Sequence, residues 1–251
     1  MSRSAARVAA VVAGLLCHTA FLAGVGAMVV SLYGGMTPGA GTLHGGAAVA
    51  ADAALLLQFP LLHSFLLSRP GRRLLGRVLP APAGPRLVPT TYAFVASLQL
   101  LATFRGWSPS GVVWWVATGP LRAVVTAAFA AAWLFLGLAM RDAGLSTQTG
   151  SLGWTSLWRD RPLVYPPMPT AGTFRLCRQP VYVAFAATLW TVPAWTPDAL
   201  AIALVWTAYC VVGPLHKEAR YRRAFGEAFE AYRRQTPYWI PSGTRAPVAV
   251  R

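Results

Sequence analysis

Long apolar segments alternate with short polar ones along the chain. Residues 5–32, 47–67, 88–104 and 119–140 are each long and apolar enough for a membrane-spanning helix, which needs about 20 residues. Two shorter apolar segments, 180–196 and 199–215, are interrupted by Pro193, Pro197 and Asp198, and predict a helical hairpin that just crosses the membrane. This pattern predicts an all-α, polytopic membrane helical bundle with about five to six transmembrane helices.

The polar segments between these spans differ in character. The connector 69–86 is rich in arginine and broken by prolines, and segment 141–177 is polar, proline-rich and aromatic. Residues 216–235 predict a charged amphipathic tail helix, because one face of it would carry a set of five residues spaced three or four apart, Glu218, Tyr221, Phe225, Phe229 and Tyr232. We expect one membrane-embedded domain over 1–251, with a four-helix part at 5–140 and a part at 141–241 that holds the connector, hairpin and tail helix.

Composition strengthens the membrane interpretation. The chain is 55% hydrophobic and 12% charged, with seven acidic against 22 basic residues and a net charge of +15. Soluble domains carry about twice that charged share, so both a water-soluble globule and a disordered chain are excluded. Because the arginines lie between apolar runs, they favour anionic lipid headgroups rather than nucleic acid as partners.

The distribution of arginines also predicts the topology. Cytoplasmic loops carry the positive excess, which places the N-terminus, the connectors 69–86 and 141–178 and the C-terminal tail on the cytoplasmic side. Three scattered cysteines without a CxxC pair, and histidines without helical ligand spacing, give no support for a metal site.

Two polar residues lie inside the second span. Asp52 is an ionisable group in a membrane segment, where such groups are costly and often functional. His63 lies about three helical turns further on, roughly 16 Å along the axis, so the two side chains cannot touch. The structural alternatives are a buried polar tie to another helix for Asp52 and interfacial capping for His63.

The densest group of polar residues stands at the mouth of the hairpin. Arg175, Arg178 and Tyr182 would grip a carboxylate or a phosphate there, although arginines that anchor to lipid headgroups give the same pattern. Glu218 lies on the aromatic face of the basic tail helix and needs a positive partner or ligand to offset its desolvation. The alternative is a surface helix in which Glu218 pairs with a nearby arginine.

At this group of residues the sequence resembles the isoprenylcysteine carboxyl methyltransferase superfamily. The residues that match are Arg178-Gln179-Pro180-Val181-Tyr182, then Lys217-Glu218, Phe225-Gly226, and Tyr232 with Pro237. Within that group it is most similar to the bacterial methanethiol S-methyltransferase-like branch, through Leu62-His63-Ser64, Thr91-Tyr92, Gly111-Val112-Val113-Trp114 and Tyr165-Pro166-Pro167. The resemblance covers roughly residues 10–241.

The resemblance implies an integral-membrane methyltransferase of the bacterial cytoplasmic membrane that uses S-adenosylmethionine. The acceptor would be small or lipophilic, with a thiol as the leading candidate, and the cofactor would enter from the cytoplasm. The cofactor pocket would be formed by Tyr165, Arg175, Arg178, Gln179, Pro180, Tyr182 and Glu218. The residues expected in catalysis are Arg178, Glu218, His63 and Asp52, with His63 as the weaker candidate for a base.

The chain also departs from the family pattern. Gln179 replaces the signature histidine, Ala184 a glycine, Lys217 the first of two acids, and Ala219 an arginine. Glutamine cannot be protonated, and a lysine beside a cationic sulfonium weakens cofactor binding unless it points outward. Two other functions therefore stay open: different chemistry on the same scaffold, such as isoprenoid rearrangement or cyclisation with Asp52 and Glu218 as acids, or a non-catalytic membrane binder.

Overall fold

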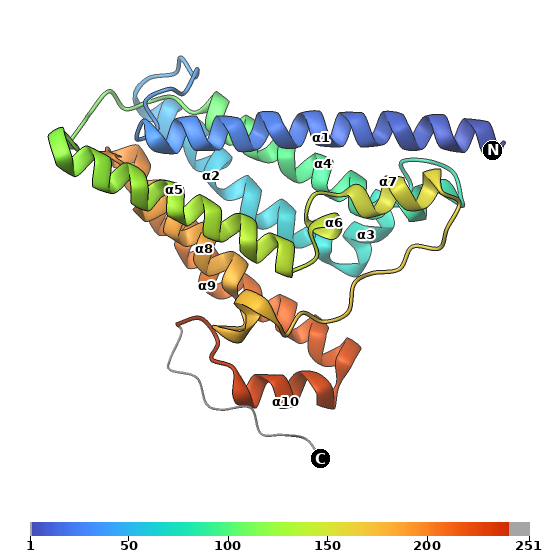
Figure 1. Ribbon diagram of the computed structural model, residues 1–251. Coiled ribbons are helices and arrows are strands. Elements are labelled where there is room, and N and C mark those ends of the chain that lie inside the picture. Colours follow the sequence, from blue (N-terminus) through green and yellow to red (C-terminus); the bar gives the residue numbers. More distant parts are fainter. Residues whose placement is uncertain (1, 241–251) are drawn as a thin grey trace. The chain divides into compact units, whose positions relative to one another are not determined.

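The computed structural model describes residues 2–240, and helices dominate them (Figure 1). Five helices are long and apolar enough to cross a membrane, which confirms the all-α membrane prediction. They are α1 (Arg3–Tyr33), α2 (Gly45–Leu67), α4 (Ala83–Gly106), α5 (Gly119–Asp142) and α9 (Pro197–Phe225). The shorter elements are α3 (Arg69–Leu75), α6 (Leu145–Gln148), α7 (Ser151–Trp158), the 3-10 turn η1 (Gly172–Arg175), α8 (Pro180–Trp190) and α10 (Glu227–Gln235). The two-residue strands β1 (Trp115–Val116) and β2 (Ala194–Trp195) pair antiparallel.

The tail helix begins later than the sequence predicts. We expected a separate helix from residue 216, but α9 continues through Pro214 as far as Phe225. The chain breaks instead at Gly226, whose φ of 52° lies in the left-handed region that glycine adopts readily. The amphipathic tail helix is therefore the shorter α10, and the predicted aromatic face is shared between α9 and α10.

The described residues form two compact units. The first contains residues 2–116, 145–165 and 193–201, and the second contains residues 117–144, 166–192 and 202–240. That the whole chain acts as one membrane-embedded domain stays a prediction.

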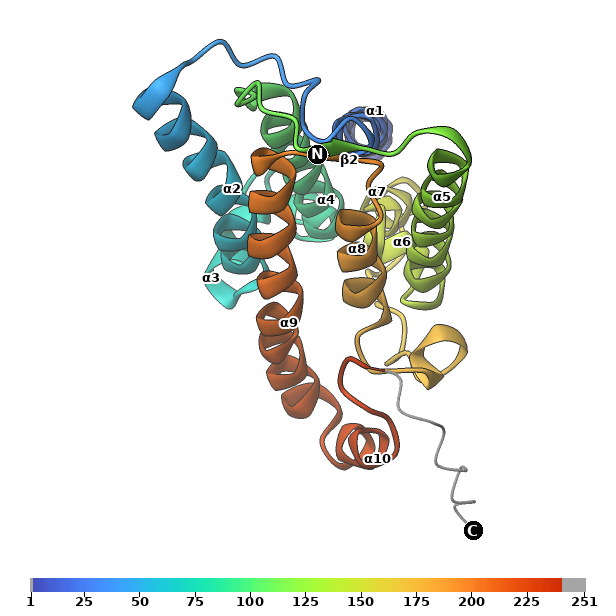
Figure 2. The same cartoon turned by 90° about the vertical axis from the view of Figure 1, so that its left-hand side faces the viewer.

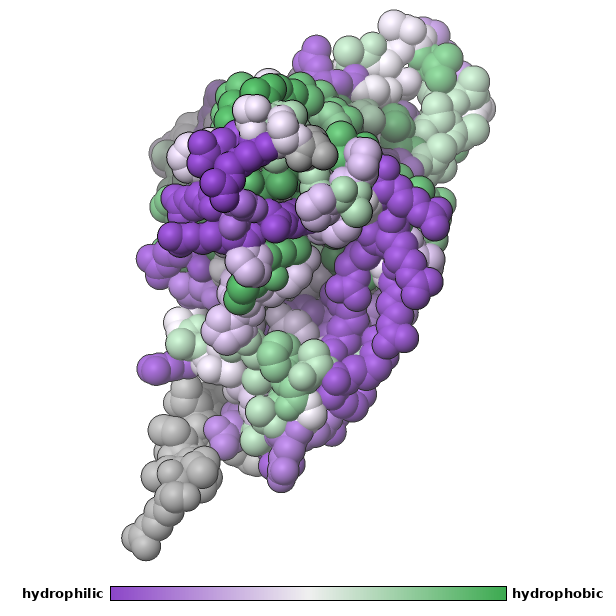
Figure 3. Space-filling view, turned by 90° about the vertical axis from the view of Figure 1, so that its right-hand side faces the viewer, coloured by the Kyte–Doolittle hydropathy of each residue, from purple (hydrophilic) through white to green (hydrophobic). Residues whose placement is uncertain are grey.

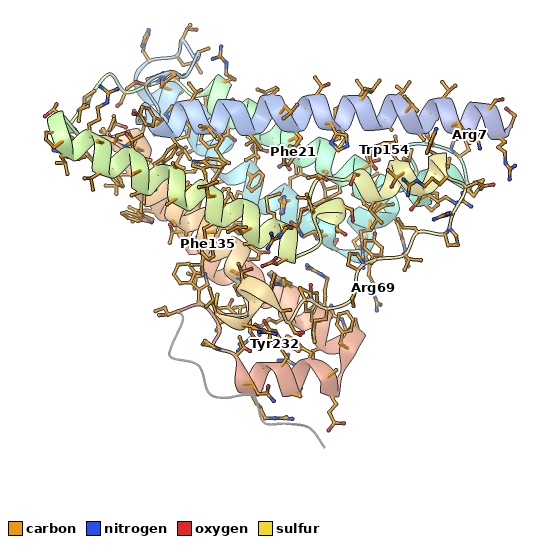
Figure 4. The ribbon with its side chains drawn as sticks, viewed as in Figure 1. Arg7, Phe21, Arg69, Phe135, Trp154 and Tyr232 are labelled. Carbon is orange, nitrogen blue, oxygen red and sulfur yellow. The ribbon has the colours of Figure 1, made fainter. Side chains whose placement is uncertain are left out.

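In the first unit, α1 packs along α4 and α7 (Figures 1 and 2). Small residues allow this close approach, because a Cβ atom at Gly24 would lie 2.5 Å from the Ser97 carbonyl oxygen of α4. Gly14 likewise makes room for the ring of Trp154, which lies between α7 and α1 (Figure 4) and donates a 3.1 Å hydrogen bond to His18. Glycines and an aromatic side chain thus hold α1 in place.

The connectors at one end of this unit are tied together. The pair β1–β2 joins the segment after α4 to the segment before α9, with Trp115 opposite Trp195. Thr196 donates a 2.6 Å hydrogen bond to the Gly35 carbonyl in the turn after α1. These three connectors therefore lie at the same end, as the predicted alternation of spans requires.

In the second unit, α8 lies between α5 and α9 (Figure 2). Trp190 of α8 donates a 2.8 Å hydrogen bond to Thr207 of α9, and the rings of Phe185 and Trp206 stack with centroids 5.9 Å apart. At the end of α5, Asp142 accepts hydrogen bonds from the backbone and the hydroxyl of Thr173, at 2.8 and 2.9 Å. These contacts position η1 and the start of α8, where the candidate site lies.

Candidate functional site

The start of α8 and the C-terminal half of α9 meet at one buried ion pair. Arg178 Nε lies 2.8 Å from Glu218 Oε1, and the two side chains are only 11% and 9% exposed. Gln179, which is 1% exposed, donates a 2.9 Å hydrogen bond to the same oxygen. The carboxylate on the aromatic face of the helix therefore has its positive partner, which comes from 40 residues earlier in the chain.

The end of α10 and the segment after it enclose the guanidinium group of Arg178. Its Nη1 donates to the backbone carbonyl oxygens of Arg233 and Thr236, and its backbone N–H donates to Pro237 at 2.9 Å. The guanidinium carbon also lies 5.4 Å from the centroid of the Tyr238 ring. Arg178 is thus held from several sides. Pro237 belongs to a matched motif, but the sequence did not indicate any contact between Arg178 and this segment.

Lys217 points into the site rather than outward. Its ammonium donates a 3.0 Å hydrogen bond to the Gln179 side-chain oxygen and one of 3.3 Å to the Arg178 carbonyl oxygen. It also lies over three aromatic rings, at 5.2 Å from the centroid of Phe174, 5.3 Å from Tyr221 and 6.0 Å from Tyr182. The two departures from the family motif, Gln179 and Lys217, therefore contact each other.

A tyrosine joins this group of residues to η1. Tyr232 of α10 donates a 2.7 Å hydrogen bond to the Phe174 carbonyl oxygen, and its side chain points from α10 toward the rest of the second unit (Figure 4). Burial raises the pKa of the Tyr232 hydroxyl, so the group stays protonated and remains a donor at neutral pH. Burial also raises the pKa of the Cys177 thiol, which makes it an unreactive structural cysteine rather than a nucleophile.

The other predicted site residues lie in different places. Pro180 is the buried first residue of α8, whereas Arg175 is exposed at the end of η1. Tyr165 belongs to the first unit, is 48% exposed, and interacts electrostatically with Arg72. Of the expected pocket residues, the structure brings together Arg178, Gln179, Tyr182 and Glu218, with Lys217 among them.

Asp52 and His63 are also in the first unit, each with its own partner. Asp52, 7% exposed, accepts a 3.0 Å hydrogen bond from the backbone N–H of Ser108, which ties α2 to the segment after α4. His63 hydrogen-bonds the Tyr92 hydroxyl of α4 and packs against the ring of Phe59. The sequence predicts that the two side chains do not touch, and their hydrogen bonds go to different partners, Ser108 and Tyr92.

Several known proteins are similar in sequence to this chain. No family model and no solved structure matches the chain. A methanethiol S-methyltransferase of Pseudomonas deceptionensis is 28% identical over 207 residues, which cover 80% of this chain and 75% of that protein. Proteins of the same name from Crocosphaera subtropica and Mycobacterium tuberculosis are 26% and 25% identical, over 76% and 78% of this chain and 73% and 79% of their own length. The resemblance predicted from the motifs is thus confirmed: over most of its length, the chain is similar in sequence to the methanethiol S-methyltransferase-like branch.

Proposed function

We propose that the chain is an S-adenosylmethionine-dependent methyltransferase of the bacterial cytoplasmic membrane that methylates the sulfur of a small or lipophilic thiol. Five apolar helices and relatives named as methyltransferases support the coarser description, an integral-membrane methyltransferase. The observation that carries the proposal is the cluster of Arg178, Gln179 and Glu218. These residues come from two separate motifs of the resemblance and form one buried hydrogen-bonded group.

The residues in this cluster suit the chemical groups of S-adenosylmethionine. The cluster contains a guanidinium, a type of group that binds the cofactor's carboxylate, and a carboxylate, which suits its amine or hydroxyl groups; Arg178 and Glu218 pair with each other in this structure, so the cofactor would exchange for part of that pairing. The rings of Phe174, Tyr182 and Tyr221 suit a cation. Lys217 is the exception, because its ammonium lies over these same rings. When bound, the cofactor supplies an electrophilic methyl group on a positively charged sulfur.

Charge in the cluster favours an anionic acceptor. The thiolate is the nucleophilic form of a thiol, and nearby cations lower the pKa of a thiol. Because Glu218 pairs with Arg178 and the ammonium of Lys217 hydrogen-bonds to neutral oxygens of Gln179 and Arg178, Lys217 brings an uncompensated positive charge to the cluster. We infer that Lys217 stabilises the thiolate of the acceptor, whose proton passes to water. Gln179 takes up no proton, and its amide holds Glu218 and Lys217 in place.

The test is methyl transfer by the purified full-length chain in detergent. Labelled S-adenosylmethionine is supplied with methanethiol or longer-chain thiols, and product and heat stability are followed. We expect transfer to thiols and a higher melting temperature with S-adenosylhomocysteine, since a ligand that binds only the folded state stabilises it.

Matched variants assign this activity to the site. Glu218→Gln should abolish both responses, whereas Glu227→Gln changes an exposed acid at the start of α10 and should leave both intact. Turnover of an isoprenoid without the cofactor would favour rearrangement or cyclisation instead. Absence of both cofactor binding and turnover would leave a membrane binder and refute the proposal.

A further inference from the structure

Four arginines line one open surface cavity in the first unit. The cavity has a volume of about 520 Å³ and is lined by Arg69, Arg72 and Arg73 of α3 and by Arg77 just after it, with Pro85 and Val88 of α4 as its apolar wall. All four arginine residues are exposed, and Arg69 extends away from the helices at the start of α3 (Figure 4). Figure 3 shows that hydrophilic side chains gather on the face that carries the N-terminal end of α1.

Close backbone packing brings these arginines to the same cavity. A Cβ atom at Gly71 would lie 2.2 Å from the Phe65 carbonyl oxygen, so only glycine lets α3 turn back against the end of α2. A Cβ atom at Gly84 would lie 2.1 Å from the carbonyl oxygens of both Gly76 and Leu79. The corner formed by α2, α3 and α4 therefore depends on two glycines, and the cavity is a built feature of the fold.

The described part of the chain supplies no carboxylate to this cavity. Among residues 2–240, no carboxylate lies within salt-bridge distance of the four arginines. The sequence has only seven acids, and six of them have partners elsewhere: Asp52, Asp142, Asp160, Asp198, Glu218 and Glu230. The seventh, Glu227, is an exposed residue at the start of α10 and forms no ion pair with these arginines in the part of the chain that the structure covers. Within the described residues, the four guanidinium groups are therefore available to an anion from outside the chain.

We propose that this cavity is a binding site for a phosphate group. Several guanidinium groups around one cavity match the tetrahedral oxygens of a phosphate, to which arginine donates in pairs. Two exposed apolar residues flank the arginines, Leu74 (54% exposed) and Val78 (60% exposed). At a membrane surface, these side chains would lie against lipid. The phosphate comes either from the headgroup of an anionic lipid or from a soluble phosphorylated compound.

The experiment compares the two sources on the full-length chain. The melting temperature is measured in nanodiscs of phosphatidylcholine with and without phosphatidylglycerol, and in phosphatidylcholine nanodiscs with inorganic phosphate against chloride at equal ionic strength. A variant with all four arginines changed to glutamine is compared with a matched control that carries four other exposed arginines as glutamine, Arg122, Arg159, Arg223 and Arg234.

We expect the wild-type protein to melt at a higher temperature with phosphatidylglycerol, with inorganic phosphate, or with both. The arginine-cavity variant should lose this response, since each lost charge-assisted contact weakens binding by roughly tenfold, and the control variant should keep it. A response to phosphatidylglycerol alone identifies a lipid headgroup, and one to inorganic phosphate identifies a site for soluble phosphate. Equal responses of the two variants, or no response of the wild type in either arm, would overturn the proposal.

A second variant tests the shape of the cavity without changing its charge. Gly84→Ala retains all four arginines but forces the corner apart, and Gly137→Ala is its control because a Cβ atom there meets nothing within 4 Å. We expect Gly84→Ala to bind phosphate more weakly, and unchanged binding by a folded Gly84→Ala protein would contradict a built site. If that variant does not fold, the arginine variants decide the question.

Discussion

Replacing Glu218 with glutamine tests the ion pair on which the candidate site depends. The change keeps the size of the side chain but removes the charge that faces Arg178 at 2.8 Å. Breaking a buried ion pair by removing one partner costs about 3–5 kcal/mol, because the other charge stays buried. Arg178 retains the carbonyl oxygens of Arg233 and Thr236 as acceptors, so we expect the lower end, about 3 kcal/mol. For a chain of this length, that corresponds to a melting temperature lower by roughly 6–12 °C.

The three cysteines provide the assay. All are free and buried, so a thiol-reactive fluorescent dye reports unfolding of the detergent-solubilised protein. Glu227→Gln is the matched control and should melt like the wild type. The double variant Arg178→Gln/Glu218→Gln should cost less than the sum of the single variants, with a coupling of about 1–3 kcal/mol. A Glu218→Gln protein that melts within a degree of the wild type, or single effects that simply add, would refute the proposed role of the pair.

Three further predictions concern other parts of the chain. Gly24→Ala should destabilise the protein by about 1–3 kcal/mol, since its Cβ would meet the Ser97 carbonyl. The control Gly26→Ala has open space around it and should not destabilise the protein. Equal melting curves for the two variants would contradict this packing. Lys217→Met should raise the affinity for S-adenosylmethionine relative to S-adenosylhomocysteine by about tenfold, because removing one nearby positive charge favours only the cationic ligand. Calorimetry measures both affinities, and an unchanged ratio of the two would disprove the charge effect. The hydrogen bond from Arg222, with the charge of Arg233, lowers the pKa of Glu230. Its carboxylate therefore stabilises the fold above its unfolded pKa of about 4.3 and loses that effect as the pH falls through the lower folded value. The difference in melting temperature between wild type and Glu230→Gln should accordingly be present at neutral pH and disappear in acid, and a constant difference would rule this out.

Much of the fold is predictable because a bilayer imposes a simple rule on sequence. A helix that crosses it needs a long apolar run, so the bounds of α1, α2 and α5 agree with the apolar segments to within a few residues. Local rules predict the end of α9 less well. The change to charged residues suggested a boundary near 216, but α9 continues through Pro214 to Phe225, because a proline can kink a long packed helix without ending it.

The partners of individual polar residues depended on long-range packing. That Glu218 needed a positive partner follows from the cost of burying a charge among aromatic residues, yet its pairing with Arg178 and Gln179 joins segments 40 and 39 residues apart. The inward direction of Lys217 and the carbonyl oxygens around Arg178 had no signal in residue type or spacing. The order of helices is encoded locally by hydropathy, whereas contacts between distant segments arise only when those helices pack, because side-chain hydrogen bonds require atoms within about 3 Å of each other.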